Sequence, residues 1–135
     1  MSRKMFVNLP VADLPKAMAF FKALGFTFNM QFSDDTAAAM VISEENYAML
    51  LTHPKFTGFS QKPLPDTRAT QGVMVAISLE SRAEVDAMLE AALAAGGTEP
   101  TPANDHGFMY QRTIEDLDGH RWEPFWMDPS FVQPA

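Results

Sequence analysis

The first half of the chain alternates between the apolar spacing of strands and that of a helix. Residues 5–11 alternate between two faces, which predicts a strand. An apolar stripe at helical spacing follows, with Asp13 as its N-terminal cap and Gly25 just past its end. Alternation returns in residues 26–32, 37–42 and 47–52. The first half therefore has the predicted order β-α-β-β-β.

The second half repeats this order. Residues 73–79 alternate as a strand, and Ser81 and Glu84 have the spacing of a capping box, in which each side chain accepts the backbone N–H of the other residue. A helical stripe follows and ends at Gly96. A short strand at residues 98–102, a hairpin of residues 108–114 and 120–127, and an irregular tail at residues 128–135 complete the chain.

Two such modules predict an α+β fold, in which each sheet has a helix on one face and the two sheets curl into a half-barrel around a cleft. At 135 residues the chain fits a single domain, with modules at about residues 4–53 and 71–128. Residues 54–70 are rich in proline, so we interpret them as a loop that links the modules.

The predicted hairpin carries the clearest candidate for chemistry. Asp118-Gly119 is a strong signal for a tight turn, and an aromatic strand follows it. Alternation along this strand puts Arg121, Glu123 and Phe125 on one face and Trp122, Pro124 and Trp126 on the other. Because an unpaired carboxylate is expensive to bury, Glu123 is expected to face water, a cation or a cavity.

Composition narrows the classes of partner. The net charge of −7 argues against nucleic acid, whose binding needs a basic patch, and favours a cationic or neutral small molecule. The chain has no cysteine, which excludes disulfides and thiolate metal sites. No apolar run approaches membrane-spanning length and no signal peptide is recognisable, so we expect a cytoplasmic protein without a membrane partner.

Four segments together carry a family resemblance: Leu9-Pro-Val-Ala-Asp13, Phe20-Phe21, Leu24-Gly25-Phe26 and Asp116-Leu-Asp-Gly-His-Arg-Trp-Glu123. By their order and spacing the chain resembles the vicinal oxygen chelate superfamily, which includes glyoxalase I, bleomycin-resistance proteins and extradiol dioxygenases. The resemblance covers nearly the whole chain. It implies paired β-α-β-β-β modules around a U-shaped cavity, and a homodimer.

The resemblance also implies where a metal would bind. Metal enzymes of the superfamily place one ligand on the inward face of several strands, and the matching positions here are Phe6, Leu50, Met74 and Glu123. Three of these four residues are apolar, whereas a catalytic divalent metal needs about three nitrogen or oxygen ligands from the protein. We therefore expect no cofactor, and a divalent metal is disfavoured.

Glu123 is the candidate catalytic residue, and three roles are open to it. It can be a metal ligand, it can bind a ligand's cation or act as a general base, or it can be a cavity carboxylate that is hydrated or paired with Arg121 or Arg112. The expected ligand contacts are Phe6, Asn8, Leu50, His53, Met74, Tyr110, Arg112, Arg121 and Phe125. Tyr110 and Arg112 share a strand face and contact a ligand only if that face is the concave one.

Three functions from different classes follow. The first is a glyoxalase/bleomycin-resistance-like protein that has lost the metal and binds or sequesters a small, largely apolar molecule in the cleft. The second is a lyase, isomerase or dioxygenase that uses Glu123 as a base or metal ligand. The third is a non-enzymatic assembly module, which a closed and filled cavity would favour. Whether the chain is an enzyme is left open.

Overall fold

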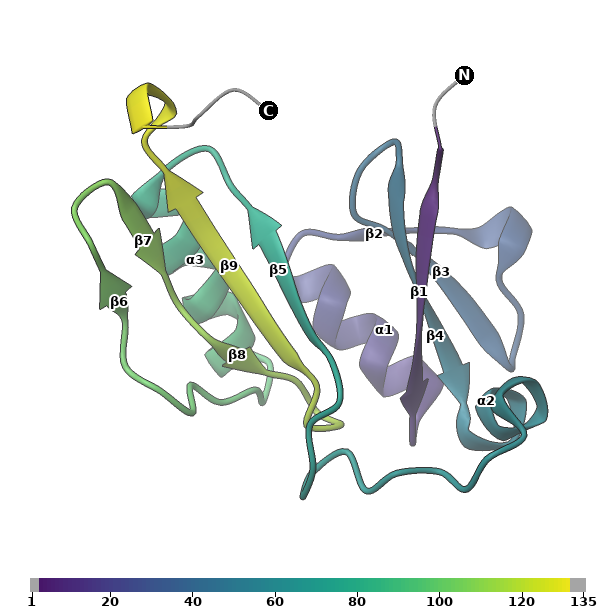
Figure 1. The fold of residues 1–135 in the computed structure, drawn as a ribbon. Helices are drawn as coiled ribbons and strands as arrows, with labels where there is room; N and C mark the ends of the chain where they lie inside the picture. Colours follow the sequence, from purple (N-terminus) through teal and green to yellow (C-terminus); the bar gives the residue numbers. More distant parts are fainter. Residues whose placement is uncertain (1–2, 132–135) are drawn as a thin grey trace. The chain divides into compact units, whose positions relative to one another are not determined.

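The computed structural model describes residues 3–131, which form two compact units (Figure 1). The first unit ends at Asp66 and the second begins at Thr67. Each unit contains helices and one mixed β-sheet, which confirms the predicted α+β fold class.

The first unit contains the predicted β-α-β-β-β series in the predicted order, together with two short helices that were not predicted. Its elements are β1 (Met5–Val11), α1 (Leu14–Ala23), β2 (Thr27–Asn29), the short 3-10 helix η1 (Met30–Phe32), β3 (Ala37–Val41), β4 (Asn46–Thr52) and α2 (His53–Ser60). The strand order is β1-β4-β3-β2, with β1 parallel to β4 and the other neighbours antiparallel. The Asp13 carboxylate caps α1 as predicted, because it accepts the Lys16 N–H at 3.1 Å.

Alternation divides this sheet into a face that packs against α1 and an opposite face that is only partly exposed. Leu9 of β1 pairs with Leu50 of β4, and both side chains are buried. Helix α1 packs against β3 and β4 and buries Phe20 and Phe21, so it covers the face that carries Leu50. The opposite face carries Phe6, which is 51% exposed.

Two predictions for the first unit were wrong. The strand predicted at residues 26–32 stops at Asn29, because the Asn29 side chain accepts the Gln31 N–H at 3.0 Å and turns the chain into η1. Residues 54–60, predicted as part of a loop, belong to α2. Proline is compatible with the first turn of a helix, where its missing N–H has no partner to lose, so Pro54 starts this helix rather than preventing it.

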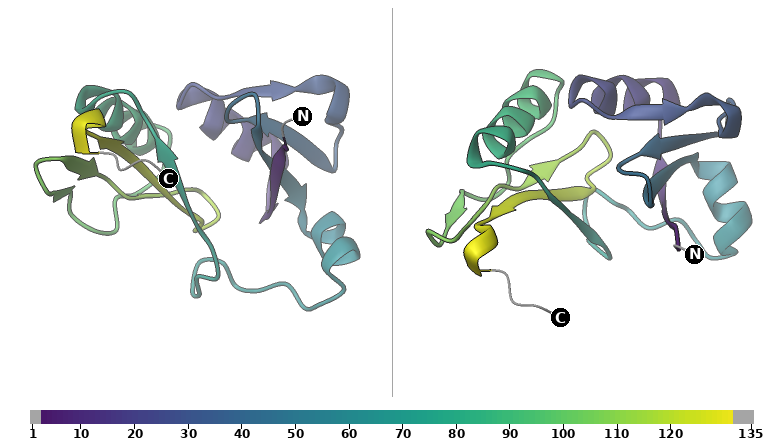
Figure 2. Two further views of the ribbon diagram at one scale, coloured as in Figure 1. Left: turned by 45° about the horizontal axis from the view of Figure 1, so that its top comes forward. Right: turned by 90° about the horizontal axis from the view of Figure 1, so that it is seen from above.

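The second unit holds the hairpin and a longer helix. Its elements are β5 (Met74–Ser78), α3 (Arg82–Ala94), β6 (Asn104–Asp105), β7 (Met109–Gln111), β8 (Ile114–Glu115), β9 (Arg121–Met127) and the 3-10 helix η2 (Pro129–Phe131). The strand order is β5-β9-β7-β6, and β8 pairs with β9 beyond β7. Helix α3 lies across one face of this sheet (Figures 1 and 2).

Several boundaries in the second unit differ from the predicted ones. Residues 98–102 contribute a single bridge, between Thr98 and Glu115, because Pro100 and Pro102 have no N–H to donate to a ladder. The strand predicted at residues 108–114 is divided into β7 and β8. The predicted irregular tail begins with η2, and residues 132–135 lie outside the described part of the chain.

The predicted capping box is only half present. The Ser81 hydroxyl accepts the Glu84 N–H at 3.1 Å, as expected. The Glu84 carboxylate, however, accepts the N–H of Glu80 at 2.7 Å rather than that of Ser81. Helix α3 therefore still has both side chains satisfying backbone donors at its start.

Candidate functional site

The sheet of the second unit has one face toward α3 and one open face. Trp122 pairs with Val75 and is buried on the helix side. Glu123 pairs with Ala76 and lies on the opposite face. By the same register, the open face also carries Met74, Ser78, Gln111, Glu115, Arg121 and Phe125. The predicted separation of Glu123 from the tryptophans is therefore present in the structure.

Glu123 is half-buried and is held by a residue that the sequence analysis missed. Its Oε2 accepts a hydrogen bond from Gln111 Nε2 at 2.9 Å. Within residues 3–131 no cationic side chain forms an ion pair with Glu123. Alternation from Tyr110 and Arg112 would have placed Gln111 on the opposite face from them, so the signal for this contact was available in the predicted strand.

The predicted pairing of Glu123 with Arg121 or Arg112 is wrong. Arg121 shares the open face, but its Nε lies 3.7 Å from Glu115 Oε2, across the β8–β9 pair. Arg112 points to the other face of the sheet, where it pairs with Asp86 and Glu99. The charges of Glu115 and Arg121 therefore neutralise each other. The charge of Glu123 is not neutralised in this way, so the open face has a net charge of one negative unit.

Besides the polar side chains of Gln111, Glu115 and Arg121, the open face near Glu123 carries short and apolar residues. Ala76 stands opposite Glu123 and Ser78 opposite Phe125, and both β5 residues are exposed. Met74, 57% exposed, lies at the start of the same strand. The residues that β5 places opposite Glu123 and Phe125 are therefore short and exposed.

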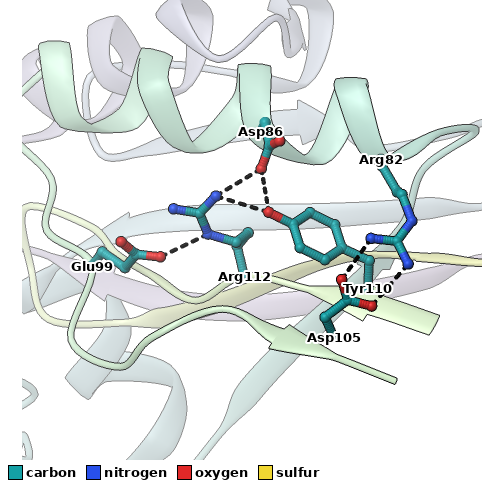
Figure 3. Close-up of polar contacts among 6 residues, drawn as sticks. All are labelled: Arg82, Asp86, Glu99, Asp105, Tyr110 and Arg112. Atoms are coloured by element: carbon teal, nitrogen blue, oxygen red, sulfur yellow. Dashed lines mark hydrogen bonds and ion pairs between the residues drawn. The ribbon is translucent and has the colours of Figure 1, made fainter. Parts of the chain in front are cut away.

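Tyr110 and Arg112 do not contact this face, which corrects their predicted role as ligand contacts (Figure 3). They share a strand face as predicted, but it is the one covered by α3. Tyr110 Oη donates to Asp86 Oδ1 at 2.5 Å, and Arg112 Nη1 donates to the same oxygen at 2.7 Å. Arg112 Nε also donates to Glu99 Oε2 at 2.7 Å. These bonds tie α3 to the sheet, so the two residues stabilise the unit.

The electrostatics of this network agree with a structural role. The hydrogen bond to Asp86 and burial raise the pKa of Tyr110, so its hydroxyl keeps its proton. The hydrogen bond to Glu99 raises the pKa of Arg112 further above its ordinary value. Both shifts keep the protons that Tyr110 and Arg112 donate in these bonds.

A second arginine, Arg82 at the start of α3, binds the β6–β7 hairpin to this helix (Figure 3). Arg82 donates to both oxygens of Asp105, at 2.9 and 2.8 Å, and its guanidinium lies 4.9 Å from the centre of the Tyr110 ring. The hydrogen bond from Arg82 lowers the pKa of Asp105 well below its ordinary range. Trp126 also packs on this side, 5.3 Å from the Arg82 guanidinium.

The predicted contacts in the first unit lie on two different faces. Phe6 and Asn8 are exposed on the face of the first unit's sheet that lies opposite α1, where the Phe6 ring stacks on Tyr47 with 4.6 Å between centroids. His53 is half-buried at the start of α2, and its carbonyl accepts the Thr57 hydroxyl at 3.1 Å. Leu50 has no exposed surface and belongs to the core beneath α1, so its predicted ligand contact is wrong.

The sheet register shows which residue of β4, instead of Leu50, matches the metal-ligand position of the superfamily. Asp13 and Ser81 are equivalent residues, because each caps the helix of its module, and their numbers differ by 68. The same difference makes Asn8 in the first module equivalent to Ala76 in the second. Ala76 pairs with Glu123 and Asn8 pairs with Met49. Met49 is therefore the counterpart of Glu123 in the first module, and it too is apolar.

Asp116 is a structural residue that the sequence analysis overlooked. Its Oδ1 accepts the N–H groups of Asp118 and His120 at 2.9 and 3.0 Å, and its Oδ2 accepts Trp122 Nε1 at 2.9 Å. Burial raises the pKa of Asp116, while the charge of His120 and the bond from Trp122 oppose this shift. The Asp116 carboxylate thus stabilises the β8–β9 turn and fixes the orientation of Trp122, whose side chain lies on the opposite face of β9 from Glu123.

The donor set does not fit the metal that the fold family implies. Phe6, Met49 and Met74 present no nitrogen or oxygen atom at their side chains, and Glu123 is the one remaining donor at these positions. Elsewhere in residues 3–131, no group of three or more His, Cys, Asp or Glu side chains is placed to hold a metal ion. In the same residues, no helix is both long enough and apolar enough to cross a membrane.

Comparison with known proteins supports the family resemblance. Residues 3–43 match the family model described as bleomycin resistance protein-like N-terminal. The fold is similar to that of hypothetical protein SA1046 from S. aureus, with a TM-score of 0.78, 28% identity and coverage of 93% of this chain and 95% of that one. No curated protein matches the sequence.

Two further solved structures share the fold and carry family names. One is a glyoxalase/bleomycin resistance protein/dioxygenase family enzyme from Burkholderia phytofirmans, with a TM-score of 0.79, 14% identity and coverage of 93% and 99% of the two chains. The other is a glyoxalase-related enzyme from Fulvimarina pelagi, with a TM-score of 0.77, 19% identity and coverage of 93% and 88%. These findings confirm the predicted resemblance to the vicinal oxygen chelate superfamily.

Proposed function

We propose that the protein binds or sequesters a small, largely apolar molecule without a metal, using the open face of the β5–β9 sheet. The observation that carries this proposal is the half-buried carboxylate of Glu123, which Gln111 holds on a sheet face that also presents Met74 and Phe125. Phe6, Met49 and Met74, at the other positions that resemble metal-ligand positions, are apolar. Small-molecule sites commonly combine apolar side chains with a few oriented polar groups.

Binding of an uncharged apolar fluorophore, Nile red, tests this proposal. We expect its fluorescence to rise with the wild-type protein, and we expect Met74→Glu to lower its affinity several-fold, because that change puts a charge on the open face. Leu93→Glu is the matched control, since Leu93 is a similarly exposed apolar residue, 46% against 57%, but lies on α3. Equal effects of the two changes, or no binding by the wild type, would contradict the proposal.

A second candidate function is enzymatic, with Glu123 as a general base. Its support is the Gln111 hydrogen bond, which holds the carboxylate in one orientation while no cation neutralises it. A general base needs this kind of fixed position within hydrogen-bond reach of its substrate. Under this alternative Glu123→Gln abolishes turnover, whereas under the binding function it changes only affinity.

We also propose that the protein is a homodimer, as the resemblance implies. Large apolar side chains of the first unit are exposed, among them Phe59 at 67%, Phe32 at 66% and Met30 at 63%. Surfaces of this kind are poorly protected on a monomer. Light scattering at micromolar concentration is expected to give twice the 15.0 kDa of one chain. A mass of one chain would contradict the dimer.

A further inference from the structure

We infer that Glu123 and Gln111 form a specificity pair that selects a small organic cation with an apolar body, and this inference rests on the proposed binding function. The two residues are neighbours across β7 and β9, where Gln111 stands opposite Phe125 and reaches diagonally to Glu123.

The first argument is hydrogen-bonding capacity. With Gln111 Nε2 donating to Glu123 Oε2, the amide oxygen of Gln111 and the second carboxylate oxygen are both acceptors. A ligand group with several N–H donors satisfies both, whereas a carboxylate or phosphate meets acceptors and a negative charge. The pair therefore favours an ammonium or amidinium head group.

The second argument is charge. Among the charged side chains of the open face, Arg121 lies near Glu115, and Glu123 has no cationic partner. Glu123 is half-buried on a sheet face, where water screens a charge less completely than on a fully exposed surface. A cationic ligand would neutralise this excess charge.

The third argument is shape. Ala76 and Ser78, the residues of β5 opposite Glu123 and Phe125, have short side chains and are exposed. Phe125 lies two residues along β9 from Glu123, about 7 Å away on the same face. A head group at Glu123 can therefore extend an apolar body of a few carbon atoms, or one ring, over Phe125.

A matched series of three compounds tests this inference: 4-phenylbutylammonium, 4-phenylbutanol and 4-phenylbutanoate, each measured by calorimetric titration or displacement of Nile red. They share an apolar body and differ in charge. We expect the ammonium compound to bind about 3- to 10-fold more tightly than the alcohol, as a partly screened charge contact allows, and the carboxylate to bind most weakly.

Variants of Glu123 and Gln111 test whether these two residues cause the preference for the ammonium compound over the alcohol. Glu123→Gln is expected to make the ammonium compound and the alcohol about equal in affinity, because the ammonium compound loses its charge contact. Gln111→Leu is expected to reduce the preference, because the carboxylate loses the bond that positions it. Glu90→Gln removes the same charge from the exposed side of α3 and is expected to preserve the preference, which controls for the overall charge of −7.

The outcomes separate the two proposals. Binding of all three compounds without preference, or a preference that survives Glu123→Gln, overturns the ligand class but leaves the binding function. Failure of all three compounds and of Nile red to bind overturns both. Thermal unfolding of each variant shows whether it is folded, and Glu123→Asp serves as a second variant if Glu123→Gln is not.

Discussion

Gly119→Ala is expected to destabilise the protein by about 3 kcal/mol or more, because the β8–β9 turn has no space for a Cβ atom. Gly119 has a φ of +85°, and a Cβ there would lie 2.4 Å from the carbonyl oxygen of Thr67 and 2.8 Å from the Cα of Arg68. These contacts are with backbone, which cannot rotate away as the end of a side chain can.

The segment that crowds Gly119 is itself bonded to the turn. The Thr67 hydroxyl donates to the Asp118 carbonyl at 2.6 Å, and Arg68 Nη2 donates to the Leu117 carbonyl at 2.7 Å. Relieving the clash in Gly119→Ala would therefore separate residues 67–68 from the hairpin and break these bonds. The start of the second unit is thus locked onto the turn that precedes Glu123's strand.

Gly107→Ala is the matched control. Gly107 has a φ of +79°, but a Cβ at this position meets nothing within 4 Å. Its replacement therefore costs the backbone strain alone, about 1 kcal/mol. The measurement is the free energy of unfolding by denaturant for both variants. Equal losses would show that the close approach of residues 67–68 to Gly119 does not constrain the turn.

Trp122→Ala is expected to cost about 3–5 kcal/mol, since it truncates a large buried side chain. Trp122 is 2% exposed and its indole N–H donates to the buried carboxylate of Asp116. Trp122→Phe keeps most of the packing and loses that bond, so we expect a smaller loss of about 1–3 kcal/mol. Both values come from denaturant unfolding of the variants against wild type.

Glu123→Gln, one residue along the same strand, is expected to leave stability nearly unchanged, because the amide keeps the shape and still accepts a hydrogen bond from Gln111. The contrast between neighbours follows from the alternation of faces. If Glu123→Gln unfolded the protein while Trp122→Ala were harmless, the face assignment would be reversed and the candidate site would fail with it.

Periodicity predicted the fold well where elements are long. The alternation of β1 and β9 and the apolar stripes of α1 and α3 gave the two sheets and their main helices. It failed where a single side chain or proline decides the backbone: Asn29 ends β2 early, and Pro54 begins a helix inside an apparent loop. Local hydrogen bonds of this kind do not follow a period, so alternation does not reveal them.

The candidate site was predicted in part. Alternation correctly placed Glu123, Arg121 and Phe125 on one face, because the side chains of a strand alternate without exception unless a bulge intervenes. It could not choose the face of Tyr110 and Arg112, since that depends on which side α3 packs. The position that matches a metal ligand was predicted at Leu50, one residue after Met49, where the register puts it. An error of one residue along a strand moves the predicted side chain to the opposite face of the sheet.

Metal analysis of the protein purified without chelator tests the central claim most directly. With Phe6, Met49 and Met74 at the positions that resemble metal-ligand positions, we predict far less than one equivalent of any divalent metal and no lyase activity on the methylglyoxal–glutathione adduct. Addition of zinc, nickel or manganese is expected to leave the melting temperature unchanged. One equivalent of bound metal together with measurable turnover would contradict the account.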